Sequence, residues 1–202
     1  MKKKSKIYIT QSSDVGLRCK LWALSNCPDD CIIVDSHEEA EQLFSVFHNK
    51  IFKKAELEGK TRSFNFHGGL LPAYRGSCTL NWAIINGEVE TGVTLHVMNS
   101  GIDTGPIVDI SKFSIEQSET AESLYKKLEI AAYELFVTWF LLLINGKYHV
   151  TAQSETGRLY KRSDIDVAKN LTCYVRAFEF AGKESAYYFT RSGKKIYLSF
   201  ED

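Results

Sequence analysis

Two polar side chains of one short segment, together with a carboxylate further along the chain, are the residues best suited to chemistry. Asn65 and His67 alternate with Phe64 and Phe66. Side chains of a strand alternate with a period of two, so the two polar groups would face one side and the two phenylalanines the other. Asp103 lies in the segment Ser-Gly-Ile-Asp-Thr-Gly, whose two glycines free the backbone around a single carboxylate.

An amide, an imidazole and a carboxylate form a set that suits a transfer to an amine. The imidazole and the amide can stabilise an oxyanion, and the carboxylate can orient the imidazole and take up a proton, directly or through water. No serine or cysteine lies beside an evident base, which disfavours a covalent intermediate; Cys78 is the nearest thiol, and we expect it to pack. A structural interpretation stays open, because a histidine can simply close a loop and Asp-Thr-Gly is a common turn.

The strand that carries Asn65 and His67 is expected over Arg62–Phe66 and ends at two glycines. Short apolar runs and amphipathic stretches alternate before it, which favours an α/β fold with a Rossmann-like, doubly wound, mostly parallel sheet. Open sheets of this type bind ligands at the carboxyl ends of their strands. The elements predicted ahead of it are strands at Lys6–Thr10 and Cys31–Val34 and helices at Asp14–Leu24 and His37–Phe47, with Ser13 and Ser36 as N-caps.

The rest of the chain predicts a catalytic domain over residues 1–150 and a C-terminal extension over residues 151–202. The domain is completed by a helix at Leu80–Asn86, strands at Thr91–Met98 and Pro106–Phe113, a helix at about Ala121–Ile144 capped by Thr120, and a strand at Tyr148–Ala152. The extension begins with a loop at Glu155–Asp164 and carries a small β-hairpin formed by Ala186–Thr190 and Lys195–Phe200. The aromatic residues of this hairpin could form a ligand platform, a dimer edge or ordinary core.

Composition limits the classes of function. The chain has 202 residues, with 25 lysines and arginines against 25 aspartates and glutamates, so its net charge is zero and a large nucleic-acid footprint is not expected. Its longest apolar run, Leu135–Ile144, is too short to span a bilayer, and no apolar signal core follows the basic start. The five cysteines lack zinc-binding spacing, so we expect no metal and a cytoplasmic protein with reduced thiols.

Three stretches of the sequence resemble the folate-dependent formyltransferases, the family that includes the methionyl-tRNA, glycinamide ribonucleotide and sugar-nucleotide N-formyltransferases. They are FNFHGGLLPAYRG, NWAIINGEVETGVTLHVMNSGIDTGPIV and TAESLYKKLEIAAYELF, within about Arg62–Phe136. The resemblance implies a catalytic triad of Asn65, His67 and Asp103 and 10-formyltetrahydrofolate as the formyl donor. It also implies that the folate pocket is lined by Leu70, Leu71 and Pro72.

The sequence departs from this family in two places. Gly68 stands where the family commonly has a proline, and this change should loosen the loop without removing the chemistry. The segment before the triad is short, whereas the family usually has more sheet there, with a strand and a loop that form part of the folate pocket. Pterin contacts from that region are therefore not assigned.

The tail after the long helix resembles that of the sugar N-formyltransferases. SETGRLYKRSDID and VRAFEFAGKESAYYFTRSGKKIYLSF carry the resemblance. It implies a nucleotide-linked amino sugar as the acceptor, with dTDP-4-amino-4,6-dideoxyglucose favoured, and a place in surface glycan biosynthesis. A pyrophosphate needs lysine or arginine and a base needs an aromatic face. The candidate substrate contacts are Lys161, Arg162 and Arg176 for the pyrophosphate and Tyr160, Phe178 and Tyr187 for the base or sugar, although surface charges and buried aromatic residues are common and each could instead have a solvated or core role.

Other functions stay open. The glycinamide ribonucleotide enzymes carry a glycine-rich phosphate loop after the first strand, where this chain has Gln-Ser-Ser-Asp-Val-Gly. The tRNA enzymes add a basic C-terminal domain, whereas this chain has a short tail and no net charge. A non-catalytic nucleotide-sugar-binding homologue is the third alternative. We expect a nucleotide sugar and a folate as partners, no nucleic acid or membrane, and a homodimer formed through the C-terminal hairpin or the segment before it.

Overall fold

The computed structural model describes residues 3–116, 118–154, 157–164, 187–189 and 193–197 of the chain. These residues belong to two compact units, Met1–Tyr160 and Lys161–Asp202, and each is described by itself. The first unit ends at Tyr160, where strand β8 (Arg158–Tyr160) pairs with a strand of the same unit.

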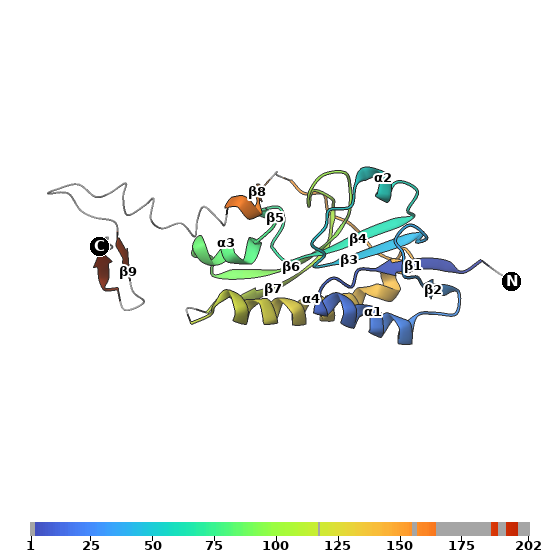
Figure 1. Cartoon of the computed structure of the whole chain (residues 1–202), viewed down its shortest axis with the longest axis horizontal. Helices are drawn as coiled ribbons and strands as arrows, with labels where there is room; N and C mark the ends of the chain where they lie inside the picture. The colour runs from blue at the N-terminus through green and yellow to red at the C-terminus, as the bar shows by residue number, and fades with distance from the viewer. Residues whose placement is uncertain (1–2, 117, 155–156, 165–186, 190–192, 198–202) are drawn as a thin grey trace. The chain divides into compact units, whose positions relative to one another are not determined.

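A six-stranded sheet forms the centre of the first unit (Figure 1). The three pairings at one side of the sheet are parallel, and the last two strands continue it with antiparallel pairings. The mixed but mostly parallel α/β sheet predicted from the sequence is therefore confirmed. In spatial order the strands are β2 (Cys31–Ile33), β1 (Ser5–Ile9), β3 (Gln42–Val46), β4 (Arg62–His67), β6 (Glu90–Val97) and β7 (Ile107–Ser114).

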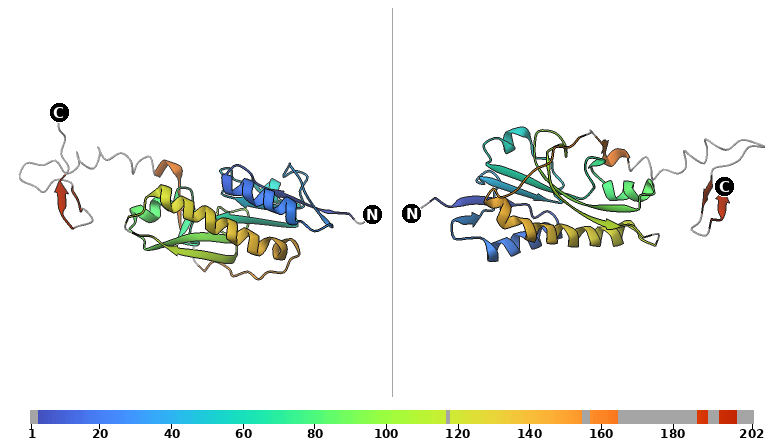
Figure 2. Two further views of the ribbon diagram at one scale, coloured as in Figure 1. Left: turned by 90° about the horizontal axis from the view of Figure 1, so that it is seen from below. Right: turned by 180° about the vertical axis from the view of Figure 1, so that it is seen from behind.

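Two long helices, α1 (Asp14–Asn26) and α4 (Ala121–Ile144), lie side by side against one face of this sheet (Figures 1 and 2). Helix α4 has the bounds that the sequence predicts, because the Thr120 side chain accepts a hydrogen bond from the N–H of Ser123 and so caps its first turn. Two shorter helices, α2 (Lys54–Leu57) and α3 (Thr79–Ile85), lie between strands in the sequence.

Phenylalanine side chains form the contact between the sheet and α4. Phe64 and Phe66 of β4 and Phe44 of β3 are fully buried. Phe44 lies 6.0 Å from Phe136 and 5.4 Å from Phe140, measured between ring centroids, and Phe66 lies 5.6 Å from Phe136. This packing orients β4, because it commits one face of the strand to the core and turns the opposite face towards the polar cluster.

The helix predicted at His37–Phe47 is wrong, because residues Gln42–Val46 of this segment form strand β3 within the sheet. All five residues of β3 are buried. A strand that is buried on both faces lacks the polar and apolar alternation by which a half-exposed strand is recognised. The apolar residues of the segment are instead spaced as on one face of a helix, at Leu43, Phe44, Val46 and Phe47.

Two further expectations are corrected at the end of the first unit. The loop predicted at Glu155–Asp164 contains β8, which pairs in parallel with β5 (Tyr74–Gly76) in a separate two-stranded sheet. The strand predicted at Tyr148–Ala152 is reduced to one isolated bridge, in which Thr151 pairs with Ile107. Both pairings join residues that are far apart in the sequence, so no local sequence pattern predicts them.

The described part of the second unit contains the predicted hairpin. Strand β9 (Tyr187–Phe189) pairs antiparallel with β10 (Lys195–Tyr197), and Tyr187 lies opposite Tyr197. Within the part of the chain that the structure describes, no helix is long and apolar enough to cross a membrane.

Candidate active site

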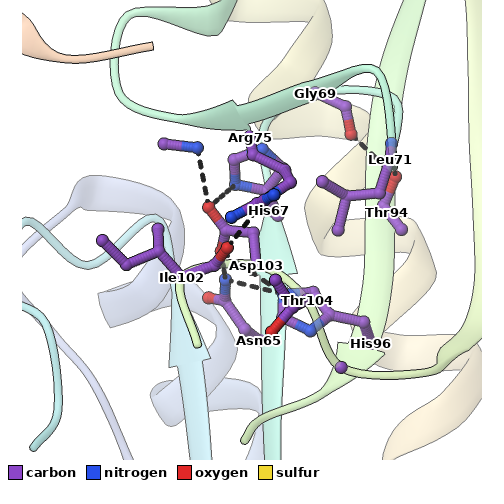
Figure 3. Close-up of polar contacts among 12 residues, drawn as sticks. Asn65, His67, Gly69, Leu71, Arg75, Thr94, His96, Ile102, Asp103 and Thr104 are labelled. Atoms are coloured by element: carbon purple, nitrogen blue, oxygen red, sulfur yellow. Dashed lines mark hydrogen bonds and ion pairs between the residues drawn. The ribbon is translucent and has the colours of Figure 1, made fainter. Parts of the chain in front are cut away.

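Strand β4 presents Asn65 and His67 at the carboxyl end of the parallel strands, as its alternation predicts. Asp103 reaches them from the loop between β6 and β7, and the three side chains converge in Figure 3. Asp103 Oδ2 lies 3.5 Å from His67 Nδ1, and Asp103 Oδ1 accepts a hydrogen bond of 3.2 Å from Asn65 Nδ2. The structure therefore brings together the three residues that the sequence nominated as catalytic.

The backbone around Asp103 has a specific geometry. Asp103 has a φ of +52°, in the left-handed region that aspartate tolerates better than most residues. Its carboxylate Oδ2 accepts a 2.9 Å hydrogen bond from the N–H of Gly76 at the end of β5. This bond and the one from Asn65 fix both carboxylate oxygens, which lie in a site where only 11% of the Asp103 side chain is exposed.

His67 is oriented by a backbone carbonyl. Its Nε2 lies 2.7 Å from the carbonyl oxygen of Tyr74. A carbonyl oxygen can only accept, so Nε2 carries the proton and donates it to Tyr74. The other ring nitrogen, Nδ1, then faces the Asp103 carboxylate, where an additional proton can be held between the two groups.

The environment lowers the pKa of both members of this pair. Burial acts to raise the pKa of Asp103, but the imidazoles of His67 and His96 and the N–H of Gly76 outweigh it and lower this pKa to about 2. Burial lowers the pKa of His67, against the Asp103 carboxylate and the Tyr74 carbonyl, which act to raise it. At neutral pH the pair is therefore a carboxylate beside an imidazole that can take up one proton.

A second histidine, which the sequence reasoning did not single out, completes the polar cluster. His96 of β6 is 2% exposed, and its Nδ1 lies 3.0 Å from the carbonyl oxygen of Val97. Nδ1 therefore carries the proton, and Nε2 accepts a 3.1 Å hydrogen bond from Asn65 Nδ2. Both N–H groups of Asn65 are thus engaged, one by Asp103 and one by His96.

The sequence did contain a signal for His96. Thr94 and His96 are two residues apart in β6, so they share one face of the strand, and both are buried polar residues. The register places His96 directly opposite Asn65 and Thr94 opposite His67. Two buried polar side chains at this spacing indicate a site on that face, but only the strand pairing shows which site.

Thr94 holds the Leu-Leu-Pro loop beside the triad. Its hydroxyl donates to the carbonyl of Gly69 at 2.7 Å and accepts from the N–H of Leu71 at 3.2 Å. Of the three residues nominated for folate, Leu71 is buried, whereas Leu70 and Pro72 are partly exposed. Two of these apolar side chains are therefore accessible to solvent, and the third packs in the interior.

The residues nominated for substrate contact are spread over both units. Tyr160 is buried in the first unit, where its ring stacks on Tyr74 at 5.3 Å and on Trp82 at 5.2 Å. In the second unit Lys161, Arg162 and Tyr187 are exposed. Arg176 and Phe178 lie outside the described residues.

Comparison with known proteins gives a family match and a curated relative. Residues 33–139 match the family model described as formyl transferase. Over 106 residues the chain is 48% identical to the bifunctional polymyxin resistance protein ArnA of Wigglesworthia glossinidia brevipalpis, which covers 52% of this chain and 16% of ArnA. The chain thus spans far less than the length of this relative.

Solved structures share the fold over most of the chain. A sugar N-formyltransferase from Shewanella sp FDAARGOS_354 aligns with a TM-score of 0.72 and 19% identity, over 97% of each chain. The N-formyltransferase from Helicobacter canadensis, solved with folinic acid and dTDP-3-aminofucose, aligns with a TM-score of 0.66 and 27% identity, over 81% of this chain and 72% of that one. At 19% identity, the likeness to the Shewanella enzyme shows the fold alone.

Proposed function

The chain belongs to the formyl transferase family, and on that premise we propose that it is a sugar N-formyltransferase. It moves a formyl group from 10-formyltetrahydrofolate to the amino group of a nucleotide-linked amino-deoxysugar. The observation that carries the proposal is the approach of His67 Nδ1 and Asn65 Nδ2 to the two carboxylate oxygens of Asp103, at 3.5 and 3.2 Å.

The residues in and beside the triad fit a folate co-substrate. Leu70 and Pro72 are partly exposed next to the triad and offer apolar contacts of the kind that a flat heterocycle needs. The folate supplies a formyl group on an amide-like nitrogen, whose carbonyl oxygen becomes negative when an amine attacks. The N–H groups of His67 and Asn65 are the donors proposed for this oxygen. They are already oriented by Tyr74, Asp103 and His96, and they exchange these partners for the oxyanion.

The His67–Asp103 pair transfers a proton from the attacking amine to the departing folate. The amine attacks as a neutral base, forms the new carbon–nitrogen bond and must lose one proton. The Asp103 carboxylate, held beside His67 Nδ1, takes up this proton, directly or through water. The pair then returns the proton to the departing folate nitrogen as the old carbon–nitrogen bond breaks. No proton is gained or lost over the cycle.

A sugar acceptor is favoured by the relatives and by charge. The two similar structures are described as a sugar N-formyltransferase and as an N-formyltransferase in complex with dTDP-3-aminofucose. The chain has no net charge, which disfavours tRNA, whose binding relies on neutralising phosphates. Within the sugar class we propose dTDP-4-amino-4,6-dideoxyglucose as the acceptor, a cytoplasmic reaction in surface glycan biosynthesis, and a homodimer.

The test is a product assay by mass spectrometry. The purified chain is incubated with 10-formyltetrahydrofolate and, separately, with dTDP-4-amino and dTDP-3-amino deoxysugars, a UDP-4-amino sugar, and glycinamide ribonucleotide. We expect a formyl mass gain on one nucleotide sugar. His67→Ala should lose the gain, and His149→Ala, which changes an exposed histidine elsewhere, should keep it.

The alternatives give different results in the same assay. A gain on glycinamide ribonucleotide alone would replace the sugar by that acceptor, and salt-sensitive binding of tRNA would point to tRNA formylation. Nucleotide-sugar binding without folate affinity or product would make the chain a binding protein. A folded His67→Ala variant with near-normal turnover would rule out His67 as a donor to the oxyanion.

A further inference from the structure

A glutamine beyond the segment that matches the family is hydrogen-bonded to the loop of the catalytic aspartate. Gln153 follows the matched residues 33–139 in the sequence. Its side-chain amide nitrogen Nε2 donates to the carbonyl oxygen of Asp103 at 3.0 Å and to that of Gly105 at 2.7 Å. Both hydrogens of one amide group are therefore donated to backbone carbonyls of the loop that carries the catalytic carboxylate.

This backbone needs to be held. Asp103 occupies the left-handed region at a φ of +52°, which for a residue other than glycine costs on the order of 1 kcal/mol. A neighbouring restraint comes from Arg75, which is buried and donates from Nε to the carbonyl of Ile102 at 2.9 Å. Arg75 therefore restrains the peptide before Asp103, and Gln153 restrains the carbonyls of Asp103 and Gly105.

Gln153 is itself held in place. Two residues before it, Thr151 exchanges a pair of 2.8 Å backbone hydrogen bonds with Ile107, the first residue of β7. On its other side, the carbonyl of Gly157 accepts a 3.3 Å hydrogen bond from Arg75 Nη1. The chain is therefore held by hydrogen bonds both before and after Gln153.

We propose that Gln153 is a positioning residue of the formyl transfer, acting through the backbone of Asp103. By holding both carbonyls it keeps the Asp103 carboxylate within reach of His67 Nδ1 and Asn65 Nδ2. The inference rests on the proposed function for its effect on turnover. The placement of the carboxylate beside His67 can be measured without any turnover.

The test compares two variants with a neighbouring control. Gln153→Met keeps the length of the side chain and removes both donors, and Gln153→Glu sets a carboxylate against two carbonyl oxygens. Ser154→Ala changes the exposed next residue. Three quantities are measured for each variant: the melting temperature, kcat and KM in the formylation assay, and the titration of the His67 imidazole by NMR.

We expect both Gln153 variants to stay folded, with kcat reduced about 10- to 100-fold and KM changed about twofold or less, as for a misplaced catalytic group. Because the Asp103 carboxylate raises the pKa of His67, its displacement should move the His67 titration to lower pH. Ser154→Ala should match the wild type in all three measurements.

Two outcomes separate the inference from the proposed function. If folded Gln153→Met and Gln153→Glu both keep the wild-type kcat and His67 titration, the positioning role is overturned. If the His67 titration moves as expected but the wild type formylates no acceptor, the positioning of Asp103 stands and the proposed function fails.

Discussion

Gly69 lies beside the hydrogen bond that orients His67, the proposed catalytic histidine. A Cβ at this position would lie 3.0 Å from His67 Nε2 and 3.0 Å from the carbonyl oxygen of Tyr74, the two atoms of that bond. It would also lie 3.2 Å from Thr79 Cβ. Gly69→Ala should therefore push His67 from its place, lower kcat about tenfold or more, and destabilise the fold by about 1–3 kcal/mol.

Gly68 is the matched control for this substitution. A Cβ there would meet Phe47 Cε1 at 3.4 Å and Leu128 Cδ2 at 3.7 Å, which are ordinary contacts. Gly68→Ala should keep kcat and stabilise the chain by about 0.4–1 kcal/mol, because alanine restricts the unfolded state. Urea denaturation and initial rates check both variants. Equal losses in the two would show that the His67–Tyr74 contact is not what Gly69 protects.

The residues of the candidate site differ in how far the sequence could predict them. Asn65 and His67 follow from alternation within one strand, and Asp103 from the family motif. His96 could not be assigned to the site, because its role depends on the register that sets it opposite Asn65. Gln153 acts through long-range hydrogen bonds to backbone carbonyls, and such bonds leave no periodicity in the sequence.

At the scale of elements, one indole links helix α4 to strand β7. Trp139 Nε1 donates a 2.7 Å hydrogen bond to Asp109 Oδ2. Trp139→Phe removes this donor and leaves a partly buried carboxylate without it. We expect a loss of about 1.5–3 kcal/mol in the free energy of unfolding, as for hydrogen bonds to charged groups, measured by urea denaturation.

Trp82 of α3 provides the comparison. Its Nε1 is buried and has no hydrogen-bond partner among the described residues, while its ring stacks on Tyr160 at 5.2 Å. Trp82→Phe keeps a ring and removes an unsatisfied donor, so these effects oppose one another and the change should cost less than Trp139→Phe. A cost for Trp82→Phe equal to or above that of Trp139→Phe would contradict the role given to the Asp109 hydrogen bond.

The elements also show why some structure was predictable and some was not. Helix α4 was found with its bounds because a capping threonine and a regular apolar stripe both act within a few residues. The sequence predicts a helix where β3 lies, because full burial removes the alternation typical of a strand. It predicts a loop where β8 lies, because this strand is stabilised by pairing with β5, which lies far away in the sequence.

At the scale of the whole molecule, the pair formed by Asp103 and His67 links folding to pH. The pKa of Asp103 is lowered from its ordinary 3.8 to about 2, so the unfolded chain binds a proton more readily than the folded one as the pH falls. The stability that this carboxylate contributes is present above pH 3.8 and is lost as the pH falls towards 2. His67 acts in the same direction, since burial lowers its pKa and acid again favours the unfolded chain.

The contribution of Asp103 can be isolated in a chain where His67 no longer titrates. We compare His67→Gln with the double variant His67→Gln/Asp103→Asn and follow the free energy of unfolding by urea denaturation from pH 6 to pH 2. Gly76, Asn65 and His96 still surround the carboxylate in the single variant. Its stability should therefore fall by about 1–2 kcal/mol more than that of the double variant as the pH drops below about 4. Parallel curves would mean that these donors do not hold Asp103 ionised, and that its low pKa depends on His67 alone.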